Sequence, residues 1–216
     1  MEYSKGGALE AIRGRLTHKT GILGGSFDPI HLGHTDMALA ARESAGLISL
    51  LFMPLSLPPH KYNVHAAAAD RLNMTELAIR GIPNASVSNI EISRGGTTYT
   101  VDTLKELARL FPGTEFFFII GADTLLTLDT WKRFDEVSRM VDFICAARPG
   151  VDDRQLADQA RKLNETYKTR IKIMDHAGLN VSSSEIRELV RKNKPIGGMV
   201  CPDVEQYILN RGLYRE

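Results

Sequence analysis

The chain has 216 residues, a length that one domain with a single core can accommodate, so a second independent domain is not expected. Hydrophobic residues make up 43% of the sequence and charged residues 25%, and no apolar run approaches the ~20 residues that a membrane-spanning helix needs. We therefore expect no membrane insertion, and the formal net charge of +1, carried by scattered basic residues, argues against nucleic acid as a partner.

The first 19 residues contain no apolar core of the signal-peptide type. We expect residues 1–19 to form an extension and residues 20–216 to form the domain itself. The two cysteines, Cys145 and Cys201, lie far apart and form no CxxC pair, which disfavours both a zinc knuckle and a disulfide framework. A cytoplasmic location is therefore predicted, and Cys145, within an apolar run, is interpreted as a small buried hydrophobe.

Along the chain, short apolar runs alternate with longer segments of helical period, which is typical of parallel strands joined by crossover helices. Strands are predicted at 20–24, 47–53, 85–92, 115–120, 141–147 and 170–175. Helices are predicted at 33–45, 67–80, 101–110, 152–166, 183–192 and 204–210, with an interrupted helix over 124–139. The pattern predicts an α/β fold of one domain, Rossmann-like and doubly wound, with a mainly parallel sheet and helices on both faces.

The first predicted strand runs into a loop of sequence GGSFDPIHLGH, residues 24–34, which leads into a helix. Ligands in open α/β sheets bind beyond the carboxyl ends of the strands. Glycines allow the backbone to approach a ligand closely, and a helix start offers N–H groups and a partial positive charge to an anion. The loop therefore predicts a phosphate site, although it is neither a Walker A loop nor a GxGxxG fingerprint.

His31 and His34 lie three residues apart at this helix start and would point in similar directions if the helix began near His31. Two imidazoles placed in this way can donate to phosphate oxygens. A metal pair is the alternative, but no third ligand stands at a convincing spacing, so no metal site is predicted.

The stretch GGSFDPIHLGH resembles the HxGH signature of nucleotidyltransferases that are distantly related to class I aminoacyl-tRNA synthetases. The resemblance implies that His31 and His34 contact the phosphates of ATP, with His34 stabilising the transferring α-phosphate. Phosphopantetheine adenylyltransferases have a nearly identical stretch. The loop therefore indicates the reaction class and leaves the acceptor open.

A second stretch, VSSSEIR at residues 181–187, contains the capping-box pattern from Ser182 to Glu185, which is typical of a helix start. It also resembles the second signature of the same family. That resemblance implies that the serine hydroxyls and amides bind the β- and γ-phosphates, while Arg187 adds a bidentate clamp.

The acceptor is indicated by middle segments that resemble bacterial nicotinate-nucleotide adenylyltransferases. The resemblance of residues 58–61, Pro-Pro-His-Lys, implies that Lys61 approaches phosphate and that His60 supports the acceptor. The alternative for both residues is a solvated turn. Residues 97–103 imply that Thr98 and Tyr99 line a nicotinate pocket, whereas Thr100 or Asp102 could merely cap the next helix.

Two further positions complete the resemblance, which covers roughly residues 20–214. Trp131, the only tryptophan, is expected to stack on the pyridine ring, with a core position as the alternative. Asp123, after the aromatic strand, is expected to accept from ribose hydroxyls, and Arg148 is a candidate anion contact.

The site that the resemblance implies has three overlapping sets of residues. The catalytic set is His31, His34, Lys61 and Arg187. The ATP-binding set is Gly24, Gly25, Ser26, Phe27, His31, His34, Gly121, Asp123, Ser182, Ser183, Ser184, Ile186 and Arg187. The substrate-binding set is Ser26, His60, Lys61, Thr98, Tyr99, Asp123, Trp131 and Arg148.

Such a site needs no general base if the acceptor is a phosphate monoester, because a second pKa of about 6 leaves that phosphate largely dianionic at neutral pH. Catalysis then reduces to in-line positioning and charge neutralisation, with Mg²⁺ carried on ATP. The expected reaction transfers the AMP unit of ATP to nicotinate mononucleotide and releases pyrophosphate. Transfer to phosphopantetheine and a non-catalytic nucleotide-sensing module remain the alternatives, and self-association into a homo-oligomer is left open.

Overall fold

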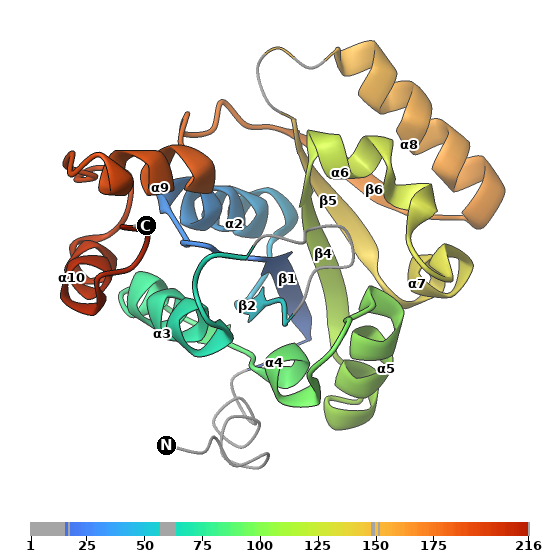
Figure 1. The fold of residues 1–216 in the computed structure, drawn as a ribbon. Coiled ribbons are helices and arrows are strands. Elements are labelled where there is room, and N and C mark those ends of the chain that lie inside the picture. Colours follow the sequence, from blue (N-terminus) through green and yellow to red (C-terminus); the bar gives the residue numbers. More distant parts are fainter. Residues whose placement is uncertain (1–15, 17, 57–63, 148–149, 151, 216) are drawn as a thin grey trace.

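A computed structural model describes residues 16, 18–56, 64–147, 150 and 152–215. Six strands form one sheet in the order β3-β2-β1-β4-β5-β6, and every pairing between neighbours is parallel (Figure 1). The strands are β1 (Lys19–Gly25), β2 (Ser49–Pro54), β3 (Ala85–Val87), β4 (Glu115–Gly121), β5 (Asp142–Ala147) and β6 (Ile171–Asp175).

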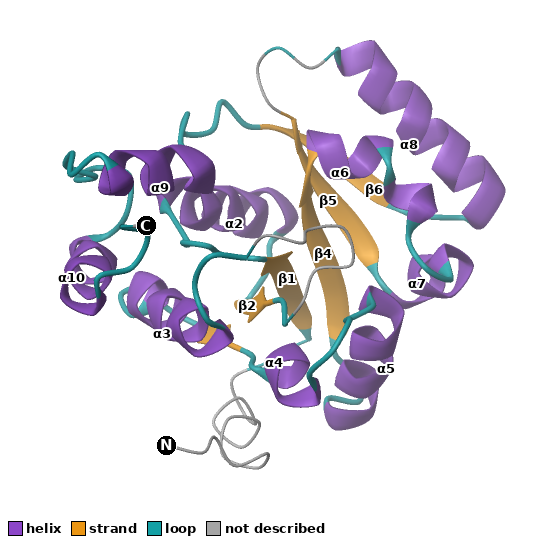
Figure 2. Cartoon of the chain, in the orientation of Figure 1, coloured by secondary structure: helices purple, strands orange, loops and turns teal. Residues whose placement is uncertain are grey.

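Helices connect the strands and cover both faces of the sheet (Figure 2). They are α2 (Leu32–Ala45), α3 (Ala68–Ile79), α4 (Ile90–Arg94), α5 (Thr100–Leu110), α6 (Ala122–Leu126), the 3₁₀ turn η1 (Leu128–Thr130), α7 (Phe134–Met140), α8 (Asp153–Tyr167), α9 (Ser183–Arg191) and α10 (Pro202–Arg211). None of the helices in the described part of the chain has the length and apolar character required to cross a membrane.

The core consists of two layers, because successive strand residues point to opposite faces of the sheet. On one face, side chains such as Ile22 and Phe118 pack against α4 to α8. On the other face, Leu23 and Ile119 pack against α2, α3, α9 and α10. This arrangement confirms the predicted α/β, Rossmann-like, doubly wound sheet.

The order of the strands reverses at β1, which pairs with β2 on one side and with β4 on the other. In such sheets ligands bind at the reversal, outside the carboxyl ends of the strands. Leu23 pairs with Ile119, so the ends of β1 and β4 lie next to each other. The loop after β1 and the segment after β4 therefore flank the place where a ligand is expected.

One predicted strand was too long. Residues 85–92 contain β-branched side chains, but β3 ends at Val87 and α4 begins at Ile90. The Ser88–Asn89 pair turns the chain, with the Ile90 N–H donating to Ser88 Oγ at 3.3 Å and the Ser93 N–H to the Asn89 carbonyl at 2.8 Å. The other predicted elements agree with the structure within two residues, and the interrupted helix over 124–139 comprises parts of α6, η1 and α7.

Cys145 lies in β5 with no exposed surface, and both cysteines are free thiols. Burial raises the pKa of the Cys145 thiol to about 11. Its interpretation as a small hydrophobe is confirmed. The expected boundary at residue 20 stays a prediction, because residues 1–15 and 17 lie outside the described residues.

Candidate active site

The loop between β1 and α2 places two imidazoles together at a helix start. His31 is the N-cap of α2, in extended conformation, and its N–H donates to His34 Nδ1 at 3.2 Å. The two rings lie nearly parallel, with centroids 3.7 Å apart and planes inclined by 31°. The helix does begin beside His31, and the two side chains lie next to each other as the spacing predicts.

The same loop is tightly packed against aromatic side chains. Phe27 is buried, has a φ of +47°, and meets the His34 ring edge-on at 5.0 Å. A Cβ on Gly25 would lie 2.8 Å from the Phe27 ring, so glycine is required there for steric reasons. The ring of Phe27 therefore supports both the glycine turn and the second imidazole.

The second signature packs directly against the first. Ser183 Oγ donates to the Pro29 carbonyl at 2.9 Å, and Arg187 Nη1 donates to the Asp28 carbonyl at 2.6 Å. Arg187 Nη2 also donates to Ser184 Oγ at 3.2 Å. The N-termini of α2 and α9 lie side by side as a result, and groups from both signatures surround one region (Figure 1).

The start of α9 has the predicted cap. Ser182 is the N-cap, and its hydroxyl accepts from the Glu185 N–H at 3.1 Å. Ser182 and Ser184 are exposed and Ser183 is half-buried, so all three stand at the surface of this helix start. The Ile186 side chain is fully buried in the core, which leaves only its main chain for a ligand.

The sequence did not indicate that Asp28 would connect distant segments of the chain. Its carboxylate is 3% exposed and accepts from the His65 N–H at 2.8 Å, the Ala66 N–H at 3.0 Å and the Tyr214 hydroxyl at 2.9 Å. Burial, and then the charge of Asp28, raise the pKa of Tyr214 far above its usual value. Asp28 belongs to the loop of residues 24–34, for which a phosphate site is predicted and which we call the phosphate loop. Its carboxylate joins this loop to residues 64–66 and to the end of the chain.

The sequence also did not indicate that Arg71 would support the loop after β1. Arg71 is 1% exposed, and it donates to the Ser26 carbonyl at 2.6 Å and to the Ser56 carbonyl at 3.0 Å. Desolvation lowers the pKa of Arg71, an effect that Asp28 partly opposes. An arginine in an amphipathic helix usually lies on the solvated face, so no sequence signal marked it as a support of the loop.

Two segments that were predicted to bind the acceptor meet in the structure. Thr98 is buried, Tyr99 is the N-cap of α5, and Lys132 Nζ lies 3.7 Å from the centre of the Tyr99 ring. Neither Thr100 nor Asp102 caps α5, because the helix start has no side-chain cap and Asp102 pairs with Arg133 at 2.9 Å.

Trp131 is half-buried beside the same segment. Its ring meets Phe118 edge-on, with centroids 5.5 Å apart, and also contacts Phe143 at 6.4 Å. One part of the indole therefore packs on the core, and the rest of the side chain is accessible.

Some of the remaining predicted residues lie at the carboxyl end of β4, and the others lie outside the described residues. Gly121 ends β4 and caps α6, and Asp123 is exposed in the first turn of that helix. Both follow β4, which pairs with β1 in the sheet. The predicted residues His60, Lys61 and Arg148 lie outside the described residues.

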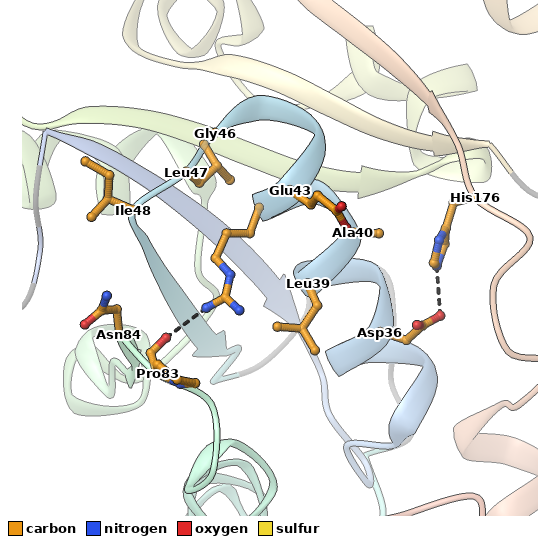
Figure 3. A pocket seen from close by; sticks show the side chains of 11 residues that line it. Asp36, Leu39, Ala40, Glu43, Gly46, Leu47, Ile48, Pro83, Asn84 and His176 are labelled. Atoms are coloured by element: carbon orange, nitrogen blue, oxygen red, sulfur yellow. Dashed lines mark hydrogen bonds and ion pairs between the residues drawn. The ribbon is translucent and has the colours of Figure 1, made fainter.

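An open hollow of about 940 Å³ lies along α2, away from this site (Figure 3). Its lining includes Leu47 and Asn84, which precede β2 and β3, so it opens toward the amino ends of these strands. His176 lies at one end of the hollow, with Nε2 3.1 Å from Asp36 Oδ2 and 12% of its side chain exposed. The hollow is separate from the phosphate loop.

Sequence comparison identifies the family. Residues 22–189 match the cytidylyltransferase-like family. A protein of Moorella thermoacetica named "Probable nicotinate-nucleotide adenylyltransferase" is 42% identical over 199 residues, which cover 91% of this chain and 92% of that protein. A protein of the same name from Carboxydothermus hydrogenoformans is 38% identical over 197 residues, covering 91% and 98% of the two chains.

Structural comparison supports the fold. The Plasmodium falciparum nicotinic acid mononucleotide adenylyltransferase complexed with NaAD matches with a TM-score of 0.74 and 22% identity, covering 91% of this chain and 98% of that one. At that identity the likeness bears on the fold alone. The family match over most of the chain and the close relatives carry the assignment: the chain belongs to the cytidylyltransferase-like family and, within it, to the nicotinate-nucleotide adenylyltransferases, a group of nucleotidyltransferase enzymes.

Proposed function

We propose that the chain transfers the AMP unit of ATP to nicotinate mononucleotide, giving nicotinate adenine dinucleotide (deamido-NAD) and pyrophosphate in NAD biosynthesis. The observation that carries this proposal is the contact of Ser183 and Arg187 with the loop that bears His31 and His34. Imidazole, hydroxyl and guanidinium donors then surround a single triphosphate. The positive ends of α2 and α9 add to its binding.

The reaction is an in-line displacement at the α-phosphorus of ATP. An oxygen of the acceptor phosphate forms a new bond to this phosphorus, while the bond to the bridging oxygen of the β-phosphate breaks and its electron pair leaves with pyrophosphate. His34 and His31 stabilise the charge on the α-phosphate, and Arg187 with Ser182, Ser183 and Ser184 holds the leaving pyrophosphate. No base is required, since the acceptor phosphate is already dianionic.

Mg²⁺ is proposed to accompany ATP. Among the described residues, no group of three His, Cys, Asp or Glu side chains is placed to hold a metal ion, and the donors at the loop suit phosphate oxygens. Magnesium is commonly bound through substrate phosphates with several waters retained. When bound, it neutralises charge on the leaving pyrophosphate.

The acceptor is proposed to lie beside α5 and η1. Thr98 and Tyr99 line its pyridine ring and carboxylate, and the accessible part of Trp131 stacks on the ring. Asp123 accepts from a ribose hydroxyl, Ser26 adds a contact to the acceptor, and Gly24, Gly25, Phe27, Gly121 and Ile186 contribute main-chain or packing contacts to ATP. His60, Lys61 and Arg148, which the structure does not describe, are proposed to contact the acceptor and its phosphate.

A direct assay separates this function from the alternatives. Pyrophosphate release is measured with ATP and nicotinate mononucleotide, and in parallel with nicotinamide mononucleotide and with phosphopantetheine. We expect rapid release with nicotinate mononucleotide and release at least 10-fold slower with phosphopantetheine. Fast turnover of phosphopantetheine, or nucleotide binding without any release, would refute the proposal.

We also propose a cytoplasmic location, because the free Cys145 and Cys201 suit a reducing compartment.

A further inference from the structure

The end of the chain returns to the phosphate loop. α10 ends at Arg211, and Gly212 follows in the left-handed conformation, so that the Leu213 N–H donates to the Ile208 carbonyl at 3.1 Å. The chain then turns back, and its end lies between α9 and α10 (Figure 1). Tyr214 is thereby brought to Asp28, 186 positions earlier in the sequence.

The contact between these two residues is specific and partly buried. The Tyr214 hydroxyl donates to Asp28 Oδ1 at 2.9 Å, and the carboxylate is 3% exposed. The His65 and Ala66 N–H groups donate to the same carboxylate, at 2.8 and 3.0 Å. Three donors from two distant segments therefore fix the orientation of the Asp28 side chain.

Tyr214 also adopts an unfavourable backbone conformation to make this contact. Its φ is +64°, in the left-handed region that costs free energy for a bulky side chain. Such a conformation persists where surrounding contacts determine it. The hydroxyl bond to Asp28 is one of these contacts.

What Asp28 fixes is part of the active site. Its main-chain carbonyl accepts from Arg187 Nη1 at 2.6 Å, and Arg187 Nη1 also lies 3.9 Å from Asp28 Oδ2. A change in the orientation of Asp28 therefore moves the guanidinium that the proposed function assigns to the triphosphate. It also moves the loop that carries His31, three residues further along the chain.

We infer that Tyr214 is a positioning residue for adenylyl transfer: through the Asp28 carboxylate, it sets the position of Arg187 and of the phosphate loop. The inference rests on the proposed function. The proposed function assigns Tyr214 no direct contact with either substrate. Its contribution is geometric, and small displacements of reacting groups are costly in an in-line reaction.

The chain offers a matched control in Tyr207. The Tyr207 hydroxyl donates to Asp70 Oδ1 at 2.8 Å, and Asp70 is buried as well. The acceptor is again a buried aspartate, and the donor again comes from the C-terminal segment. Asp70 lies in α3, however, and in the described part of the chain its carboxylate bonds to Tyr207 and Arg211, not to the phosphate loop. Replacing either tyrosine with phenylalanine removes one hydroxyl and keeps the ring.

The experiment compares Tyr214→Phe and Tyr207→Phe in the full chain. Melting temperature, kcat, and KM for ATP and for nicotinate mononucleotide are measured for each. We expect both variants to lose about 2–4 °C in melting temperature, since each lacks a hydroxyl that donates to a buried aspartate. Tyr207→Phe also loses the bond that the Tyr207 hydroxyl accepts from Asn73 Nδ2 at 2.9 Å, so its loss of stability should be at least as large. Only Tyr214→Phe should lose activity, with kcat/KM for ATP falling on the order of 10- to 100-fold while KM for the acceptor stays unchanged.

A double-mutant cycle tests the route through Asp28. If Tyr214 acts through that carboxylate, adding Tyr214→Phe to Asp28→Asn lowers kcat/KM for ATP by less than 3-fold further. Wild-type kinetics in Tyr214→Phe, an equal loss in Tyr207→Phe, or a fully additive cycle would each overturn the inference.

Binding of α,β-methylene ATP with Mg²⁺, measured by calorimetry, separates this inference from the proposed function. If the wild-type chain releases no pyrophosphate from ATP and nicotinate mononucleotide, the proposed function fails. Weaker binding of the analogue by Tyr214→Phe, with no change in Tyr207→Phe, would still support the positioning role. Equal binding by all three proteins would overturn it.

Discussion

Arg187 and Asp28 are in direct contact across 159 positions of sequence: Nη1 of the guanidinium donates to the aspartate carbonyl at 2.6 Å. The residues belong to different signatures, one near each end of the domain. Their contact brings the two signatures together beside the reversal of the strand order.

Replacing His34 with alanine should abolish most of the activity. The proposed function makes this imidazole a preorganised donor to the α-phosphate, so we expect kcat to fall on the order of 10²- to 10³-fold. Kinetics and thermal melting check this outcome. His176→Ala is the control, because His176 pairs with Asp36 beside the separate hollow. A folded His34→Ala variant with an unchanged rate would contradict the assigned role.

Arg187→Lys keeps the positive charge and removes the planar fork. Since the guanidinium donates at once to the Asp28 carbonyl and to Ser184 Oγ, lysine cannot reproduce both bonds. We expect kcat/KM for ATP to fall about 10- to 100-fold, with the acceptor KM nearly constant. The matched variant is Arg191→Lys, one turn further along α9 and paired with Glu188. Equal kinetics for the two variants would argue against a role for Arg187 in binding ATP.

Trp131→Ala should weaken binding of the acceptor more than binding of ATP. Loss of one aromatic stacking contact corresponds to an acceptor KM about 3- to 10-fold higher. Stability also falls, because the indole packs on Phe118 and Phe143. Phe134→Leu separates the two effects: it disturbs the aromatic cluster through Phe143 and Tyr167 and leaves Trp131 in place. If Trp131→Ala raises both KM values equally, the change reflects folding and the stacking role is wrong.

The two cysteines should differ in reactivity. Burial raises the pKa of Cys145 from 9.0 to about 11, while Cys201 is only half-buried. At about pH 8 we expect a disulfide reagent to label Cys201 in the native protein and Cys145 only after unfolding. Rapid labelling of both thiols in the folded chain would contradict the buried position of Cys145.

The raised pKa also gives stability a pH dependence. As pH increases, the thiol ionises first in the unfolded chain, so the contribution of Cys145 is complete below about pH 9 and is lost between about pH 9 and pH 11. Urea unfolding of the wild type and of Cys145→Ala at several pH values measures this contribution to the free energy of unfolding. The free-energy difference between the two proteins should narrow toward the upper end of this range, and a constant difference would rule out the shift.

Local patterns predicted most of the fold because the alternation of apolar runs with helical periods is continuous from residue 20 onward. The error at residues 88–92 arose where isoleucines favour a strand and the Ser88–Asn89 turn, held by its own hydrogen bonds, ends it. Intrinsic preference was overridden there by local polar contacts.

The active site could be predicted only where a motif is continuous in sequence. The histidines and the serine cap belong to short stretches, and the structure brings these stretches together. Asp28, Arg71 and Tyr214 are different, because their contacts are with partners that are 15 to 186 positions away. Nothing in the residues next to Arg71 or Tyr214 indicates such partners, and only the tertiary structure identifies them.

The long range of these contacts has a consequence for the order of folding. The loop between β1 and α2 is translated before its partners Ser183, Arg187 and Tyr214. A nascent chain can therefore fold its first strands while the loop still lacks these contacts. The loop reaches its final surroundings only after the chain as far as Tyr214 has been synthesised and has folded back onto it.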